Sequence, residues 1–266
     1  MVGQKHWFIT GISSGIGAAL AKAVLERGDR VTGTARSAEA LAHFEALAPG
    51  RAHGVLLDMA DQAGLEAAAA SAWREAPVDV LVNNAGQSLF GAFEEVSAEE
   101  TRKLFEVNVF GPWTLTRAML PLMRERGTGT VVQLSSGCGL YGLAGLSAYC
   151  ASKFALEGFS EALAQEVAGF GLKVMIVEPG AVATRFISHG TKEATQRLDS
   201  YGFVSGQGKS ILDAYYETGA VSPESVARDI LAALDGPEVP LRLLLGTDNK
   251  GGVLAKLNAI KALAEG

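Results

Sequence analysis

The chain has 266 residues, 48% of them hydrophobic and 20% charged, which is the composition of a globular protein able to bury the core of one domain. Its formal net charge of −6 provides no basic surface, so we expect neither nucleic acid nor a membrane as a partner. Cys138 and Cys150 are too few for a disulfide framework and lack the spacing of a metal site. No apolar run has the length of an export signal or of a membrane span. We therefore expect a cytoplasmic protein that holds no metal and acts on small molecules.

Short apolar segments alternate along the chain with longer segments of helical period. Strands are expected at residues 6–10, 30–35, 54–58, 78–83, 130–135, 174–179 and 241–246. Helices are expected at residues 15–27, near Leu41, and at residues 62–75, 98–126 and 149–170. This alternation predicts one doubly wound α/β domain over residues 1–266, with about seven parallel strands and helices on both faces. Such sheets bind ligands at the carboxyl ends of their strands, so functional residues are expected in the loops that follow them.

Residues 185–220 interrupt this alternation with several glycines and aromatic residues. A segment of that length within a compact domain more often serves a function than merely connects two elements. We therefore predict a mobile flap that covers the substrate. An ordinary surface loop is the alternative.

The segment TGISSGIG, residues 10–17, stands where the first strand ends and the first helix begins. Glycine permits a tight turn and lets backbone N–H groups approach a pyrophosphate, whose charge the start of a helix favours. The predicted phosphate contacts are Gly11, Ser13, Ser14, Gly15, Ile16 and Gly17. A turn that needs glycine only for packing is the alternative, because the spacing differs from G-x-G-x-x-G.

Two further strand ends carry residues suited to a nucleotide. Asp58 follows the third strand and could accept a hydrogen bond from an adenine amino group, with a backbone contact from Met59. Asn84, Ala85 and Gly86 follow the fourth strand, where a glycine allows the backbone to approach a ribose closely. The alternatives are a helix cap in the first case and a plain turn in the second.

The choice between NAD and NADP depends on the residue that follows the second strand. An acidic residue there would bind the ribose of NAD and repel the 2′-phosphate of NADP, but no Asp or Glu follows residues 30–35 directly. Arg36 stands at this position, and its planar guanidinium suits a phosphate. NADP(H) is therefore favoured, and NAD(H) stays possible if Arg36 is only a solvated charge at the start of the next helix.

Tyr149 and Lys153 are four residues apart in an expected helix, so both side chains can lie on one face. A tyrosine that exchanges protons near neutral pH needs a cation beside it, because its ordinary pKa is about 10. An ammonium about 4 Å away contributes roughly 4 kcal/mol at an effective dielectric constant of about 20, which is sufficient. Ser136, after the fifth strand, could donate a hydrogen bond to a substrate oxygen. A surface Tyr–Lys pair and a turn hydroxyl are the alternatives for these residues taken singly.

Together these segments resemble the main branch of the short-chain dehydrogenase/reductase family. The resemblance covers about residues 4–246 and rests on TGISSGIG, the Asp58 loop, NNAG, FEVNVFG, QLSSG, YCASK and PGAVAT, in that order. It implies a single Rossmann-type domain in which Tyr149 is the acid and base, Lys153 also holds the nicotinamide ribose, and Ser136 binds the substrate. Ser136 is chosen over Ser135 because the family places its serine thirteen residues before the tyrosine.

The resemblance also assigns residues outside these three. Asn108 is implied to hold a water that relays protons beyond Lys153, whereas an amide that satisfies the local backbone is the alternative. Further cofactor contacts are implied near the nicotinamide, at Pro179, Gly180, Val182 and Thr184.

The sequence therefore predicts an oxidoreductase that transfers hydride between NADP(H) and the carbonyl or secondary alcohol of an apolar small molecule. The expected pocket walls are Phe90, Cys138, Leu140, Tyr141 and Leu146. One alternative is a nicotinamide-binding sensor without turnover, since fold alone does not prove function. Another is an epimerase or dehydratase of the same superfamily, which the glycine spacing disfavours.

We also expect a homodimer or homotetramer, because the family tends to pair the long helices after its fourth and fifth strands. The second of these helices has more apolar residues than are needed for one stripe facing the sheet, so some of them are expected on its outer surface. The alternative is that all of them belong to a broad face packed in the core. They are Ala155, Leu156, Phe159, Leu163 and Val167.

Overall fold

The computed structural model of the chain describes residues 3–184, 191–206, 210 and 220–265. Its centre is a seven-stranded sheet in which neighbouring strands are parallel, in the order β3-β2-β1-β4-β6-β7-β9. The strands are β1 (His6–Thr10), β2 (Arg30–Ala35), β3 (Ala52–Leu56), β4 (Val80–Asn83), β6 (Gly129–Leu134), β7 (Leu172–Pro179) and β9 (Arg242–Leu245). The strand order reverses between β1 and β4, so the predicted doubly wound sheet is confirmed.

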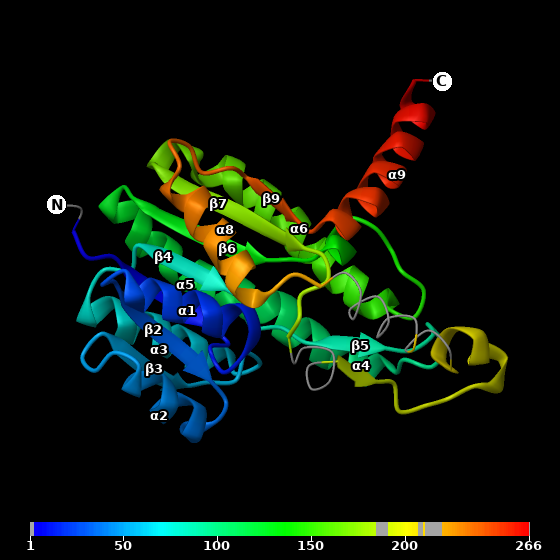
Figure 1. Cartoon of the computed structure of the whole chain (residues 1–266), viewed down its shortest axis with the longest axis horizontal. Coiled ribbons are helices and arrows are strands. Elements are labelled where there is room, and N and C mark those ends of the chain that lie inside the picture. The colour runs from blue at the N-terminus through cyan, green and yellow to red at the C-terminus, as the bar shows by residue number, and fades with distance from the viewer. Residues whose placement is uncertain (1–2, 185–190, 207–209, 211–219, 266) are drawn as a thin grey trace.

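Helices cover both faces of this sheet (Figure 1). Along β1, Trp7 and Ile9 belong to the core on one face, whereas Phe8 belongs to the core on the other. The first face is covered by α1 (Gly15–Glu26), α2 (Ala38–Ala46) and α8 (Pro223–Asp235). The second is covered by α3 (Gln62–Glu75), α5 (Gly111–Arg126) and α6 (Ser147–Val167). Because both sides of each strand are buried, the strands consist of continuous apolar runs.

The helix expected at residues 98–126 consists of three parts. The first is α4 (Ala98–Phe105), the next is a π-helical turn at Glu106–Phe110, and the last is α5. Pro112 explains the change, because it has no N–H to donate to the carbonyl of residue 108 in the α-helical pattern. In the π-helical turn, Gly111 N–H donates instead to the carbonyl of Glu106. The turn therefore gives Asn108 a different backbone environment from that of a regular helix.

The outer face of α6 differs from the sequence expectation. Leu156, Leu163 and Val167 are buried within the subunit, so the expectation that they add outer apolar surface is wrong. They belong to a broad face of the helix that packs in the core, which is the alternative given by the helical spacing of these apolar residues. The exposed apolar side chains of this region are Phe110, Trp113 and Phe154.

A small second sheet lies beyond the carboxyl edge of the main one. It pairs β5 (Ser88–Phe90) with β8 (Thr191–Glu193) in parallel. The chain after β8 forms a 3₁₀ turn at Asp199–Tyr201 and a π-helical turn at Gly202–Gly206. Of the flap expected at residues 185–220, residues 185–190, 207–209 and 211–219 lie outside the described residues.

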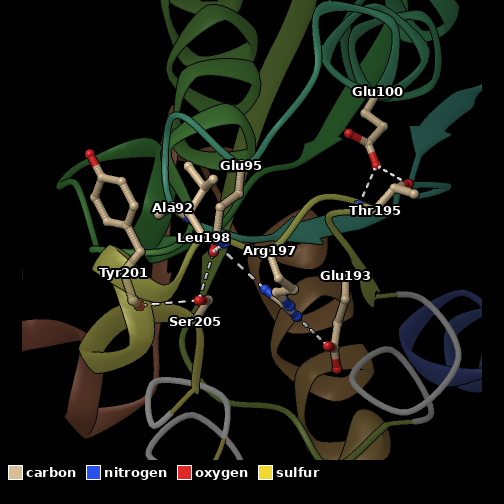
Figure 2. A network of polar contacts seen from close by, with 9 residues as sticks. All are labelled: Ala92, Glu95, Glu100, Glu193, Thr195, Arg197, Leu198, Tyr201 and Ser205. Atoms are coloured by element: carbon tan, nitrogen blue, oxygen red, sulfur yellow. Dashed lines mark hydrogen bonds and ion pairs between the residues drawn. The ribbon is translucent and has the colours of Figure 1, made fainter.

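Two carboxylates, one in the connection between β5 and α4 and one in the first turn of α4, hold the segment 191–206 (Figure 2). Glu95 accepts hydrogen bonds from Leu198 N–H and from Ser205 Oγ, both at 2.9 Å. Glu100 accepts hydrogen bonds from the N–H and hydroxyl of Thr195. Specific polar contacts therefore fix the described part of the expected flap.

The last helix, α9 (Thr247–Ala264), extends away from the sheet (Figure 1). Asn249 in its first turn is buried, whereas Leu254 and Leu257 are exposed. Its beginning is therefore buried against the domain, and further along the helix Lys256 Nζ lies 4.2 Å from the ring centre of Phe154 on α6. Among the described residues, no helix is both long and apolar enough to cross a membrane.

Candidate active site

A cleft of about 410 Å³ opens where the loops after the strands meet, a volume typical of small-molecule sites. The expected residues that line it are Gly11, Ser13, Ser14, Gly15, Ile16, Arg36, Asp58, Met59, Asn84, Ala85, Gly86, Ser136, Tyr149, Lys153, Pro179, Gly180, Val182 and Thr184. Segments that are far apart in the sequence are thus brought to one cleft at the point where the strand order reverses.

The turn between β1 and α1 needs glycine at two positions, because Gly11 and Gly15 have φ angles of +74° and +61°. Asn84 holds this turn, since its Nδ2 donates to the carbonyls of Thr10 at 2.8 Å and of Gly11 at 3.1 Å. Thr10 Oγ1 in turn accepts hydrogen bonds from the N–H groups of Asn84 and Ala85. The turn is therefore fixed against the end of β4.

Gly17 is expected as a phosphate contact, but it does not line the cleft. A Cβ atom at this position would lie 2.3 Å from Nδ2 of Asn84 and 2.4 Å from the carbonyl oxygen of Gly11. Gly17 therefore allows α1 to pack closely against the end of β4. For this glycine, the alternative that it is needed only for packing is the one that holds.

The start of α1 fits an anion. Its N-cap residue, Ser14, makes no side-chain capping hydrogen bond, and the first turn contains no acidic residue. Gly15 and Ile16 of this turn line the cleft. Backbone N–H groups at a helix start, together with the helix dipole, favour a phosphate. These residues thus fit the pyrophosphate of a dinucleotide.

Arg36 and Asp58 lie at the ends of β2 and β3 and both line the cleft. Asp58 Oδ1 accepts a hydrogen bond from Ala60 N–H at 3.0 Å, whereas the cap of α3 is Asp61. Asp61, and not Asp58, is therefore the helix cap. Arg36 is exposed at the cleft, where its guanidinium can reach a ligand phosphate.

Tyr149 and Lys153 stand one turn apart near the start of α6, and both side chains are buried beside the cleft. Lys153 Nζ lies 5.9 Å from the centre of the Tyr149 ring and donates to the carbonyl of Leu134 at 2.7 Å. An ammonium has three donor hydrogens, so the contact with Leu134 orients the group and uses one of them. The expected proximity of a cation to the tyrosine is thus present.

Burial lowers the pKa of Lys153 to about 8, because water no longer solvates its charge. The carboxylate of Glu157, one helical turn further along α6, opposes this decrease in pKa. Glu157 accepts a hydrogen bond from Arg242 Nη1 at 2.8 Å, and Arg242 also pairs with Glu178 and Glu161. An acidic cluster therefore lies directly behind Lys153.

Ser136 lies at the start of a 3₁₀ turn, Gly137–Gly139, which directly follows β6. Its Oγ accepts a hydrogen bond from Cys138 N–H at 3.2 Å, which leaves its own hydrogen available to point into the cleft. Ser135 is buried, and its hydroxyl is directed toward Glu157, whose pKa it lowers in opposition to burial. Both serines line the cleft but have different surroundings, since Ser136 Oγ is bonded to Cys138 N–H and Ser135 lies beside Glu157.

Asn108 is fully buried behind the cleft. Its Nδ2 donates to the carbonyl of Gln87 at 2.9 Å and to Ser152 Oγ at 3.0 Å, and its Oδ1 accepts from Gln87 N–H. Both amide hydrogens therefore bond to protein. A relay water would meet the backbone carbonyl of Asn108, whose α-helical donor is missing because of Pro112.

Sequence reasoning missed several residues of the cleft. They are Thr34, Ala35, Leu57, Gln87, Val107, Leu134 and Ser135. Most of them directly precede or follow a segment that was identified, so extending each motif by one or two residues would have found them. Tyr141, expected in a pocket wall, donates a hydrogen bond to Asn249 at 3.1 Å.

The profile of the short chain dehydrogenases matches residues 5–194. An oxidoreductase of Botryotinia fuckeliana is 35% identical over 246 residues, which cover 92% of this chain and 89% of the relative. The chain belongs to the short-chain dehydrogenase/reductase family. A short-chain dehydrogenase from Streptomyces avermitilis has a solved structure with a TM-score of 0.92 and 44% identity, covering 98% of this chain and 95% of that one. A metagenomic short-chain oxidoreductase solved in complex with NADP is 29% identical with a TM-score of 0.71, covering 90% and 96%.

As a short-chain dehydrogenase/reductase, the chain is an oxidoreductase with a nicotinamide nucleotide as its cofactor. The core beside the tyrosine is apolar. Phe90, Cys138 and Leu146 are buried in one hydrophobic cluster with Tyr149. These apolar side chains therefore lie beside a tyrosine that lines the cleft.

Proposed function

We propose that the protein is an NADP-preferring carbonyl reductase or alcohol dehydrogenase that acts on an apolar small molecule. The observation that carries this proposal is the arrangement of Ser136, Tyr149 and Lys153 around one cleft whose other end fits a dinucleotide phosphate. A bound nicotinamide would supply the hydride acceptor or donor in this cleft. The chain supplies the proton transfer and the alignment.

In the direction of reduction, the Tyr149 hydroxyl donates its proton to the substrate oxygen. Lys153 stabilises the phenolate that remains, because its ammonium lies beside the ring in a site with little water. Ser136 donates a hydrogen bond to the same substrate oxygen, where negative charge develops. In the opposite direction the phenolate of Tyr149 accepts the proton, so one residue serves both directions.

The cofactor preference rests on Arg36, since the cleft at the end of β2 carries this cation and no acidic residue. A charge-assisted hydrogen bond contributes about 1.5 to 3 kcal/mol, which gives roughly a tenfold to hundredfold preference for NADP(H). The substrate class rests on Phe90, Cys138 and Leu146, which surround Tyr149 with apolar groups. A hydrophobic ketone or secondary alcohol suits such surroundings.

Oxidation of NADPH with a mixed panel of hydrophobic carbonyl compounds tests the function. Tyr149→Phe should abolish turnover while cofactor affinity changes little, because only the transferable proton is removed and the ring packing remains. Tyr201→Phe is the matched control and should retain activity, because Tyr201 lies on the 3₁₀ turn after β8 and does not line the cleft. Binding of NADPH by the unmodified protein without turnover of any compound would instead favour a nicotinamide sensor.

A further inference from the structure

The first turn of α9 reaches back to the loop that carries Ser136. Asn249 in this turn is fully buried, although most of α9 lies at the surface. Its partners are Tyr141, which is 108 residues earlier in the chain, and Glu178, which is 71 residues earlier. Asn249 thus joins three distant segments.

The amide of Asn249 bonds on both sides. Its Oδ1 accepts a hydrogen bond from the hydroxyl of Tyr141 at 3.1 Å, and its Nδ2 donates to the backbone carbonyl of Glu178 at 2.9 Å. Glu178 directly precedes Pro179 and Gly180, which line the cleft at the end of β7. One side chain therefore connects the loop after β6 to the end of β7.

Two glycines make room for this arrangement. A Cβ atom on Gly137 would lie 1.9 Å from Oδ1 of Asn249, and one on Gly252 would lie 2.8 Å from the ring of Tyr141. Gly137 is the residue directly after Ser136. The amide of Asn249 is thus packed against the backbone that positions the serine.

The loop between Ser136 and Tyr141 behaves as one hydrogen-bonded unit. The N–H groups of Leu140 and Tyr141 both donate to the carbonyl of Gly137, and Gly139 N–H donates to the carbonyl of Ser136. Displacement of Gly137 or Tyr141 therefore also displaces Ser136. A shift of about 1 Å at a catalytic group can lower a rate by roughly a hundredfold.

We propose that Asn249 is a positioning residue that fixes the position of Ser136 relative to the end of β7. The proposal rests on the proposed function, since Ser136 matters only if it binds the substrate oxygen. Asn249 touches no reacting atom in this scheme. It acts through Gly137 and Tyr141, so its loss should impair the chemical step more than cofactor binding.

Asn249→Ala tests the proposal, with Asn258→Ala as the matched control because Asn258 is an exposed asparagine on the same helix. We expect Asn249→Ala to lower kcat by about tenfold or more, while the Kd of NADPH stays within about twofold. Tyr141→Phe should cause a smaller loss of kcat, and adding it to Asn249→Ala should cause little further loss. Asn258→Ala should match the unmodified protein.

Hydrogen–deuterium exchange on the cofactor-free protein provides a readout that does not need activity. Asn249→Ala should speed exchange in residues 136–141 while leaving β1 unchanged. Unchanged exchange in that loop, or a kcat within about twofold of the unmodified value, would overturn the proposal. An equal loss of kcat, cofactor affinity and melting temperature would also overturn it, because it would show only a folding defect. Failure of the unmodified protein to reduce any carbonyl would reject the proposed function, and the exchange data would still decide whether Asn249 holds the loop.

Discussion

Lys153 carries its charge where water scarcely reaches, since its side chain is only 5% exposed. Burial therefore lowers the pKa of Lys153 to about 8, and the charge of Glu157 opposes that decrease. Above this pH the side chain of the cofactor-free protein is neutral and no longer attracts a phenolate at Tyr149. We expect kcat/KM to decline as the pH rises through about 8, because this ratio reports ionisations of the free enzyme.

Glu157→Gln should move that alkaline decline to lower pH. The substitution removes a negative charge that raises the pKa of Lys153, so the ammonium loses its proton more readily. The measurement is kcat/KM against pH for both proteins. Glu161→Gln is the control, because Glu161 also pairs with Arg242 but is more exposed and does not affect the pKa of Lys153. An alkaline decline at the same pH in both proteins would contradict the role given to Glu157.

Arg36→Asp should invert the cofactor preference. It removes an attraction for the 2′-phosphate of NADP and adds a repulsion, while a carboxylate can accept hydrogen bonds from the ribose of NAD. The measurement is kcat/KM with NADPH and with NADH. Arg74→Asp, at an exposed arginine of α3 outside the cleft, controls for the change in net charge. Equal use of both cofactors by the unmodified protein would contradict the preference.

The residues that sequence reasoning could identify are those that form contiguous segments at strand ends. Gly11 to Ile16 and Asn84 to Gly86 are examples, because each segment lies beside the cleft as a unit. Asn249 could not be found in this way. Its partners are 71 and 108 residues away, and an isolated asparagine in a helix gives no sign of what it contacts. The hydrogen bond between Tyr141 and Asn249 could not be found for the same reason.

At the scale of elements, the main strands were predictable because burial on both faces makes each one a continuous apolar run. The strands β5 and β8 have three residues each, which is too short for any period to be recognised. Their pairing is set instead by contacts between distant segments, such as Ala194 N–H with the carbonyl of Phe90. The break between α4 and α5 was signalled by Pro112, although proline is also common at the start of a regular helix.

Glu95 lies outside the segment 191–206 and holds this segment by hydrogen bonds. Its carboxylate is buried and accepts hydrogen bonds from Ala92 and Leu198 N–H groups and from Ser205 Oγ (Figure 2). The bond from Leu198 is the main cause of the lowered pKa of Glu95, with burial acting in opposition. The ionised form is therefore the one that holds the segment.

Glu95→Ala should release this segment, because it leaves Leu198 N–H without its acceptor and leaves the Ser205 hydroxyl only the carbonyl of Tyr201, within the same segment. Hydrogen–deuterium exchange should become faster in residues 194–206 and stay unchanged in β4. Glu99→Ala is the control, since Glu99 is exposed and pairs only within α4 in the described contacts. Equal exchange in residues 194–206 of both variants would show that other contacts hold the segment.

At the scale of the whole molecule, the outer face of α5 and α6 presents large apolar side chains to solvent. Phe110 is 48% exposed and Trp113 is 50% exposed, and Trp113 packs edge-on against Phe159 with ring centres 5.3 Å apart. Phe154 on α6 is also exposed. Aromatic side chains of this kind are enriched in protein interfaces, and several together form a patch that favours association.

We propose that a second copy of the chain covers this face, as the family's pairing of long helices implies, and forms a homodimer or homotetramer. Light scattering at micromolar concentration should give the mass of such an oligomer. Trp113→Glu with Phe154→Glu should lower that mass, because two charges would have to be buried without partners. Leu47→Glu with Leu56→Glu is the matched control, since both leucines are exposed at the opposite side of the domain, at the end of α2 and in the edge strand β3. A monomeric mass for the unmodified protein would contradict the proposal, and a fall in mass with the Leu47→Glu and Leu56→Glu variant alone would place the interface at the β3 edge instead.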